Sequence, residues 1–209
     1  MIPTKCIRFS FLFPLLVFLL AAGCSKQPEM EIAKANTAAG EAIAAEAAVY
    51  APEALQGLEE SQKALQRELE VQEKKFALFR NYDEAKIVAE SVRLKAEKVR
   101  DTAVEKKTQA QQETAALIES TRSLLTEVQT MLASAPTGKG TALDIQVMKA
   151  DLVTMESDIT EASKRFMEND FMTAQKHARV ALSTGMSLKS DLTAAMEMKG
   201  QIRPASKKG

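Results

Sequence analysis

Apolar residues recur every three or four positions along most of the chain, which is the spacing of amphipathic helices. In the first long stretch they follow alternating three- and four-residue steps, and Gln62 and Gln72 fill the gaps. The members of this stripe are Leu55, Leu58, Leu65, Leu69, Phe76 and Phe79. Heptad spacing is typical of helices that pack as coiled coils. The pattern predicts an all-α fold of elongated antiparallel helical hairpins with coiled-coil-like seams.

An alanine-rich helix is predicted before this stripe, over residues 32–50. Its apolar side chains are Ile32, Ala35, Ala39 and Ile43. Pro52 follows. Because proline lacks an N–H and crowds the preceding turn, it ends one helix and suits the first turn of the next. We therefore expect a break at this point.

The second long helix is predicted to begin within "FRNYDEA", where Asn81 can cap it and Glu84 stands three residues on, as in a capping box. Its seam consists of Tyr82, Ala85, Ala89, Val92, Ala96, Val99, Ala103, Ala110, Leu117, Leu124, Val128 and Met131. An unbroken helix over 82–134 would be about 80 Å long. The polar stretch 106–114 is its weakest part.

The stretch "SAPTGKGTA" contains one proline and two glycines, which predicts a linker with Thr141 as the cap of the next helix. Two further heptad seams follow, on either side of an "END" turn. The first comprises Ile145, Met148, Leu152, Met155, Ile159, Ala162 and Phe166, and the second Phe171, Ala174, Ala178, Ala181, Gly185, Leu188, Leu192 and Ala195. The predicted organisation is a helical hairpin region with a long second helix at 32–134, a linker at 135–141, a second helical hairpin at 142–198 and a basic disordered tail at 199–209.

An internal repeat is suggested at an offset of 89 residues, between "NYDEAKIVAESVRLKA" and "DFMTAQKHARVALSTG". Asn81 then aligns with Asp170, and Tyr82 with Phe171. The matched seam positions are Ala85 and Ala174, Ala89 and Ala178, Val92 and Ala181, Ala96 and Gly185, and Val99 and Leu188. The alternative is a chance alignment of two amphipathic helices. Helical hairpins are expected under both interpretations.

The first 23 residues have the order of parts of a signal peptide. Lys5 and Arg8 are positive, residues 9–22 are apolar, and small residues lead into Cys24. About 14 apolar residues are too few for a membrane span, which needs about 20. An ordinary secretory signal, with Cys24 incidental, remains the alternative. Residues 24–31 are predicted to form a polar tether.

The "LAAGC" motif, residues 20–24, resembles the lipobox of bacterial lipoproteins. The resemblance implies that Cys24 becomes the acylated N-terminus, and several acyl chains give stable anchoring where one is marginal. Ser25, in place of the aspartate that retains lipoproteins in the inner membrane, implies the outer membrane and a periplasm-facing chain. Cys6 would leave with the signal peptide, so the mature chain has no second thiol for a disulfide.

Two further resemblances concern the helices. "YDEAKIVAESV" and "FMTAQKHARVA" are similar to the second helix of tetratricopeptide units, without the full repeat signature. "AAVYAPEALQGLEESQKAL" followed by "YDEAKIVAE" resembles bacterial lipoproteins with a helical domain of unknown function and a Tyr-Ala-Pro-Glu-x-Leu start. Some members carry an OmpA-like peptidoglycan-binding domain, which this sequence does not contain.

Candidate chemistry is sparse. "TGKGT" lacks the first glycine of a phosphate-binding loop, and His177 is the only histidine. Glu59, Glu60, Asp83 and Glu84 are expected on solvated helix faces. Ten methionines are better explained as seam filling than as a ligand groove. We predict no catalytic, cofactor or metal site, and no enzyme.

Without Lys5 and Arg8 the chain has 26 basic and 28 acidic residues, a balance that argues against nucleic-acid binding. The leading hypothesis is a lipoprotein anchored to the membrane through Cys24, acting as a non-catalytic helical spacer or docking scaffold for an envelope protein or the cell wall. The alternative is a carrier of a small apolar ligand between the C-terminal helices, with a pocket around Met148, Met155 and Ala181.

Overall fold

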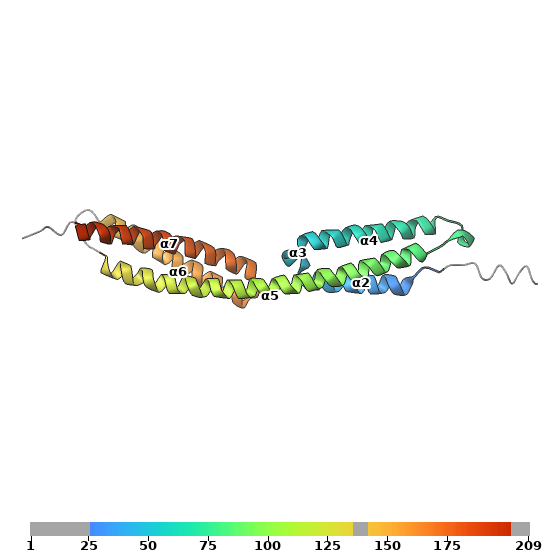
Figure 1. The fold of residues 1–209 in the computed structure, drawn as a ribbon, viewed down its shortest axis with the longest axis horizontal. Coiled ribbons are helices and arrows are strands. Elements are labelled where there is room, and N and C mark those ends of the chain that lie inside the picture. Colours follow the sequence, from blue (N-terminus) through green and yellow to red (C-terminus); the bar gives the residue numbers. More distant parts are fainter. Residues whose placement is uncertain (1–25, 136–141, 202–209) are drawn as a thin grey trace, which may run out of the picture. The chain divides into compact units, whose positions relative to one another are not determined.

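The computed structural model describes residues 26–135 and 142–201, and these form six α-helices and one short 3₁₀ helix, with no strand among them (Figure 1). The elements are α2 (Glu29–Ala44), α3 (Ala47–Tyr50), α4 (Pro52–Glu73), η1 (Ala77–Phe79), α5 (Asp83–Ser134), α6 (Ala142–Met167) and α7 (Phe171–Gln201). The predicted all-α fold is confirmed. The signal peptide, Cys24, the Thr141 cap and most of the predicted linker and tail lie outside the described residues.

The chain divides into two compact units, unit 1 at residues 1–106 and unit 2 at residues 107–209. The boundary falls inside α5, within the polar stretch that the sequence marks as the weakest part of this helix. Residues 107–134 therefore belong with α6 and α7, whereas the sequence grouped them with the first hairpin. Helix α7 continues to Gln201, so it includes the first three residues of the predicted tail.

The predicted helix at 32–50 is interrupted. Helix α2 begins at Glu29, three residues early, and ends at Ala44, and α3 follows after a short turn. At this turn Glu46 has a left-handed backbone, with φ 60°. The turn brings Ala47 and Tyr50 into the core of unit 1. The prediction of one continuous helix was wrong, because alanine-rich composition favours helix without fixing where it bends.

Unit 1 is a bundle of three helices, in which α4 is antiparallel to α5 and α2 is parallel to it (Figure 1). Lys95 of α5 donates to the Gly57 carbonyl (3.1 Å) and the Ser61 hydroxyl (2.6 Å) of α4. Arg100 of α5 contacts Glu41 of α2 at 2.8 Å. The core contains mostly small side chains: Ala35, Ala38, Ala39, Ala42, Leu58, Leu65, Ala85, Ala89, Val92, Ala96, Val99 and Ala103. Small side chains let the helices approach closely.

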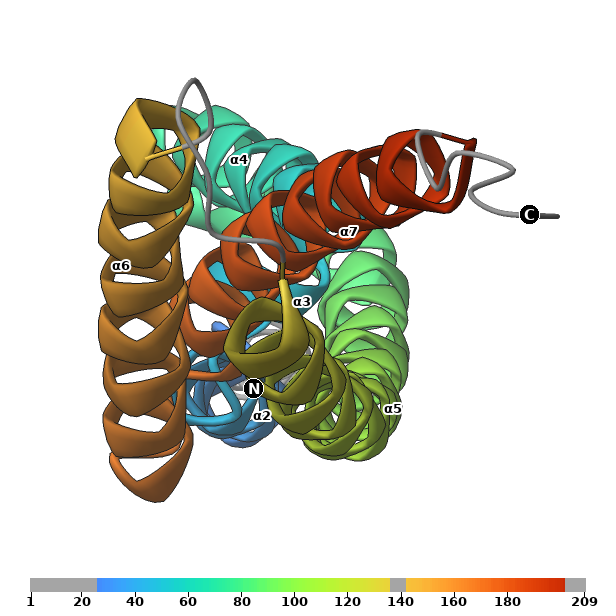
Figure 2. The ribbon, with the colours of Figure 1, turned by 90° about the vertical axis from the view of Figure 1, so that its left-hand side faces the viewer.

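In unit 2, residues 107–134 of α5 pack with α6 and α7, and α6 and α7 are antiparallel to each other (Figure 2). Its core is built in three successive clusters, centred on Ala178, Met155 and Leu188. At Gly185 an added Cβ would lie 2.6 Å from Cε of Met155 and 2.8 Å from a methyl of Leu124. The glycine therefore allows three helices to converge at this level.

The two halves of the proposed repeat have matching burial. Tyr82 and Phe171, at the start of α5 and α7, are both buried, and every aligned seam pair down to Val99 and Leu188 is buried as well. Asn81 Oδ1 accepts the Asp83 N–H at 2.8 Å, and Asp170 Oδ1 accepts the Thr173 N–H at 3.2 Å. Similar caps therefore start both helices.

The turns before these helices differ in detail. The Asn81 N–H donates to Gln72 Oε1 at 3.0 Å, so Gln72 of α4 occupies the place that the capping box assigned to Glu84. In unit 2, Asn169 has a left-handed backbone, φ 62°, and the Asp170 N–H reaches back to the Arg165 carbonyl at 3.0 Å. This arrangement is a Schellman ending of α6.

Replacing Ala89 with leucine is expected to destabilise unit 1 by roughly 1–3 kcal/mol, because the alanine is fully buried where α5 meets its neighbours. Ala116→Leu, at an exposed position of the same helix, is the matched control and should change the unfolding free energy by less than about 0.5 kcal/mol. Urea denaturation followed by circular dichroism measures both. Equal stability of the two variants would contradict the packing described for Ala89.

Candidate functional site

Cys24, the one site residue that the sequence predicts, lies outside the described residues. Lys26, the first described residue, comes two positions later, and α2 begins at Glu29. Few residues therefore separate Cys24 from the folded part of unit 1. Within the described ranges no helix is long and apolar enough to cross a membrane.

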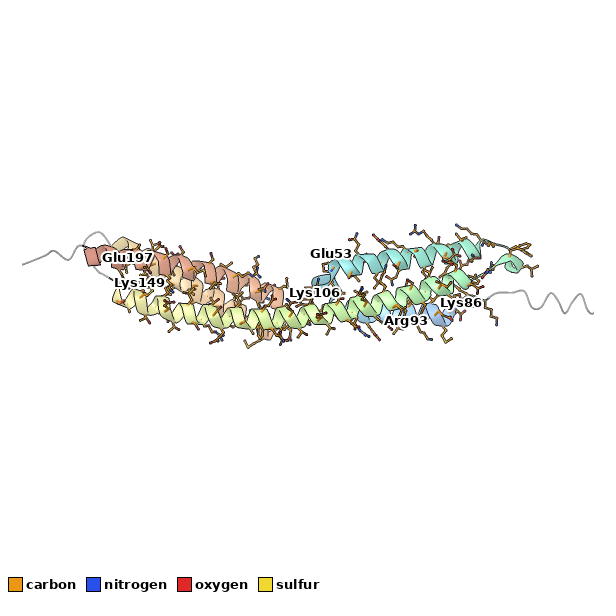
Figure 3. All side chains as sticks on the ribbon, in the orientation of Figure 1. Glu53, Lys86, Arg93, Lys106, Lys149 and Glu197 are labelled. Carbon is orange, nitrogen blue, oxygen red and sulfur yellow. The ribbon has the colours of Figure 1, made fainter. Side chains whose placement is uncertain are left out.

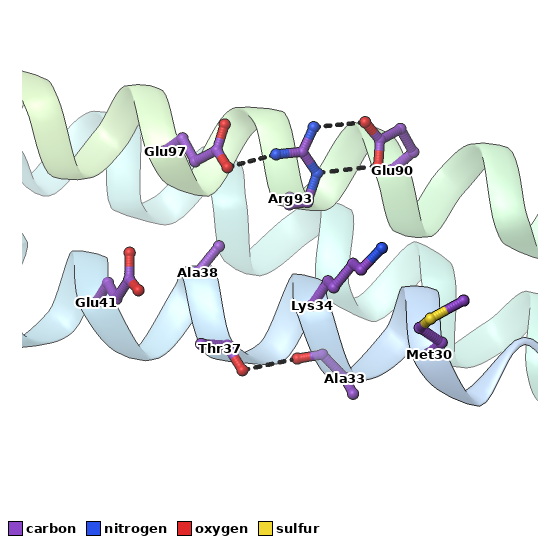
Figure 4. A pocket seen from close by; sticks show the side chains of 9 residues that line it. All are labelled: Met30, Ala33, Lys34, Thr37, Ala38, Glu41, Glu90, Arg93 and Glu97. Atoms are coloured by element: carbon purple, nitrogen blue, oxygen red, sulfur yellow. Dashed lines mark hydrogen bonds and ion pairs between the residues drawn. The ribbon is translucent and has the colours of Figure 1, made fainter.

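An open groove of about 660 Å³ lies between α2 and α5 in unit 1 (Figure 4). Helix α2 contributes Met30, Ala33, Lys34, Thr37, Ala38 and Glu41, and α5 contributes Glu90, Arg93 and Glu97. The residues come from successive turns of two parallel helices, since each helix presents a neighbour every three or four positions. The groove is therefore lined by charged side chains from both helices, together with small or apolar residues of α2.

Arg93 organises the charges of this groove. Its guanidinium donates to both carboxylate oxygens of Glu90, at 2.6 and 2.9 Å, and also contacts Glu97 (Figure 4). The hydrogen bond from Arg93 lowers the pKa of Glu90, and the nearby charge of Lys34 acts in the same direction. The same hydrogen bond, which Glu90 accepts, raises the pKa of Arg93. Glu90 and Arg93 therefore stay ionised near neutral pH, and neither is suited to give or take a proton.

The turn between α4 and α5 carries an exposed aromatic pair. Residues 74–80, "KKFALFR", are here called the tip segment. Phe76 is 69% exposed and Phe79 is 75% exposed, and their ring centroids are 6.3 Å apart. The sequence placed both on the buried seam of α4, and this was wrong. Helix α4 ends at Glu73, and the heptad phase says nothing about side-chain direction beyond the end of the helix.

Gln72 and Arg80 hold the tip segment in place. Gln72 is buried and accepts from the Asn81 N–H and from Lys75 Nζ. Arg80 donates to the carbonyls of Lys75 (3.0 Å) and Glu73 (2.8 Å), which satisfies carbonyls at the end of α4. In the sequence pattern Gln72 was only a gap in the seam. A glutamine at a seam position, one residue before the end of α4, was the available signal for this turn.

The methionines of unit 2 divide into buried and exposed sets. Met155 is fully buried, as predicted for seam filling, but Met167, Met172 and Met186 are 76%, 47% and 60% exposed. For these three, the seam-filling interpretation was wrong. A flexible, polarizable side chain at the surface adapts to irregular partners. The exposed methionines on α6 and α7 therefore mark a surface suited to contact with another molecule.

The region proposed for an apolar ligand is packed. Met155 and Ala181 are fully buried and lie in one cluster with Ile159, against Leu124 and Leu125. A smaller groove of about 410 Å³ lies towards the linker end of unit 2, lined in part by Leu132, Ile145 and Leu152. The packed cluster leaves no pocket between Met155 and Ala181.

The remaining polar candidates have ordinary surroundings. His177, partly exposed at the edge of the α7 seam, lies 3.0 Å from Asp158 of α6 through Nδ1. The carboxylates of Glu59, Glu60, Asp83 and Glu84 are exposed, as predicted. Other charged side chains also project from the helices, among them Glu53, Lys86 and Lys149 (Figure 3). Among the described residues no three potential metal ligands come together. The "TGKGT" stretch lies outside the part of the chain that the structure describes.

Comparison with family models, with curated proteins and with solved structures gave no match to this chain. The resemblance to helical lipoproteins therefore stays a prediction from the sequence.

Proposed function

We propose that this protein is a cell-envelope lipoprotein, anchored in the outer membrane through acylated Cys24 and facing the periplasm. Its two helical units act as a non-catalytic spacer or docking scaffold for an envelope protein or the cell wall. The exposed methionines of unit 2 are the observation that carries the docking role, because a flexible, polarizable methionine side chain at the surface adapts to an irregular partner.

The anchor is supported by sequence and by the start of the fold. "LAAGC" places Cys24 directly after a short apolar segment, and helix α2 follows within five residues. An acyl anchor gains about 0.8 kcal/mol per buried methylene, so more than one chain is needed for lasting attachment. A short connection would hold unit 1 close to the membrane surface.

A non-catalytic role is supported by the charges of the groove. Arg93 binds Glu90 and Glu97, and Arg100 binds Glu41 and Asp101. The hydrogen bond from Arg93 lowers the pKa of Glu90, whereas a general acid needs a pKa near the working pH. The Arg100–Glu41 pair joins α5 to α2, which suits a structural role for these charges.

Photocrosslinking in cells tests the docking role. A photoreactive amino acid at position 172 or 186 should yield the same adduct, identified by mass spectrometry as one envelope protein or as cell-wall material. The control position is Lys149, which is exposed on α6. Adducts with no preference for 172 and 186 over 149 would contradict the docking surface. A small-molecule adduct in their place would favour the carrier hypothesis.

A further inference from the structure

The tip segment exposes more apolar ring surface than a monomeric turn requires. Phe76 and Phe79 are both exposed, they lie against each other with their ring planes tilted by 51°, and Leu78 between them is 44% exposed. Three large apolar side chains thus cluster at one end of the α4–α5 hairpin. Exposing such a cluster of apolar side chains to water is unfavourable, and such clusters commonly mark an interaction surface.

Three cations surround these side chains. Lys74, Lys75 and Arg80 flank the apolar residues, and the segment contains no acid; Glu73 precedes it and Asp83 follows. Arg80 donates to the carbonyls of Glu73 and Lys75, which holds its guanidinium at the end of α4. Exposed apolar side chains flanked by cations match a bilayer surface, where anionic headgroups lie above acyl chains.

Helix α2 begins at the same end of unit 1 as the tip segment. Helix α2 is parallel to α5, and Met30 and Lys34 face Glu90 and Arg93 across the groove (Figure 4). From Glu90 back to Asp83 is about 10 Å at 1.5 Å per residue. Cys24 precedes Lys26 by two residues, which span at most about 7 Å. The start of α2 and the tip segment therefore lie at the same end of this unit (Figure 1).

We propose that the tip segment docks on the bilayer, with Phe76, Leu78 and Phe79 inserted at the headgroup level and Lys74, Lys75 and Arg80 against anionic headgroups. The placement of the anchor beside it rests on the proposed function, whereas the aromatic and cationic character of the tip does not. Two contacts in place of one orient unit 1, because a single flexible attachment leaves the unit free to rotate.

Tryptophan fluorescence tests this docking, because the chain has no tryptophan of its own. Phe79→Trp in the full chain places one fluorophore in the tip segment. Val49→Trp is the matched control, at an exposed apolar position on α3, about 33 Å from the tip along the 22 residues of α4. Each variant is bound to vesicles of phosphatidylcholine and phosphatidylglycerol that carry brominated acyl chains.

The expected result is quenching of residue 79, stronger with phosphatidylglycerol than without it, and unchanged emission from residue 49. Equal emission of residue 79 on brominated and unbrominated vesicles, with the chain bound, would overturn the docking. A blue shift that depends on protein concentration and not on lipid would also overturn it, in favour of contact between two copies of the chain. Quenching at 79 in the Cys24→Ser chain would support the tip independently of the anchor. Acylation of Cys24 is measured separately, by the mass of the N-terminal peptide, so the two failures are distinguishable.

Discussion

Replacing Cys24 with serine is expected to abolish acylation and to shift the protein from the acylated membrane fraction to a released or unprocessed form. A serine hydroxyl cannot form the thioether on which a lipoprotein anchor depends, so the signal peptide is cut without lipid or is retained. Metabolic labelling with an alkyne-bearing palmitate, followed by fractionation, separates these outcomes. We expect palmitate labelling to be lost completely.

Cys6→Ser is the matched control for this substitution, because it removes the other thiol of the chain from within the proposed signal peptide. It should leave labelling and membrane attachment as they are. Labelling that disappears with Cys6→Ser, or persists in Cys24→Ser, would contradict the assignment of Cys24 as the lipidated residue.

Replacing Leu188 with alanine is expected to lower the free energy of unfolding by about 2–5 kcal/mol. Leu188 is buried with Val128 and Leu192, and Leu124, Met148 and Leu152 pack around this cluster. Truncation removes apolar contacts and leaves a cavity between three helices, which their neighbours fill only in part. Chemical denaturation followed by circular dichroism measures the loss.

Val180→Ala on the same helix is the control, because Val180 is 45% exposed. Its effect should stay within about 0.5 kcal/mol. A similar loss for Leu188→Ala and Val180→Ala would mean that the face of α7 described as buried is not the one that packs against α5 and α6.

The seams of α6 and α7 and the first half of the α5 seam could be predicted from the sequence, because each runs along an unbroken helix where a heptad step fixes the direction of the side chains. Ala85, Ala89, Ala174 and Ala178 are buried for this reason, and their small size was itself informative. In the second half of α5 the buried residues include Thr114, Ile118 and Thr121, which the predicted seam left out. The cap at Asp170 followed from its position before an aromatic seam residue.

The errors lie where a helix ends or bends. Ile43 was expected in the seam of the first helix, but it is 65% exposed, and Ala38 and Ala42 are buried in its place. Side-chain size favoured the isoleucine, whereas the buried stripe is set by how closely α2 can approach α5. Phe76 and Phe79 were misplaced because α4 stops at Glu73. The left-handed turn at Glu46 has no marker in its residue type, since glutamate rarely adopts positive φ.

The candidate sites differ in the same way, in whether a local sequence pattern is enough to predict them. Cys24 was predicted from a short linear motif, which needs no tertiary information. The tip segment and the exposed methionines of unit 2 could not be predicted, because apolar side chains in a heptad sequence are expected inside until the packing partners are known. Which of these side chains are exposed depends on how α4 packs against α5 and how α6 packs against α7.

The mass of the N-terminal peptide, taken from protein extracted from the membrane fraction, tests the central proposal most directly. We expect a chain that begins at Cys24, with acyl groups on its thioether-linked glyceryl and on its N-terminus. A chain that begins at another residue, or a Cys24 with a free thiol, would contradict it.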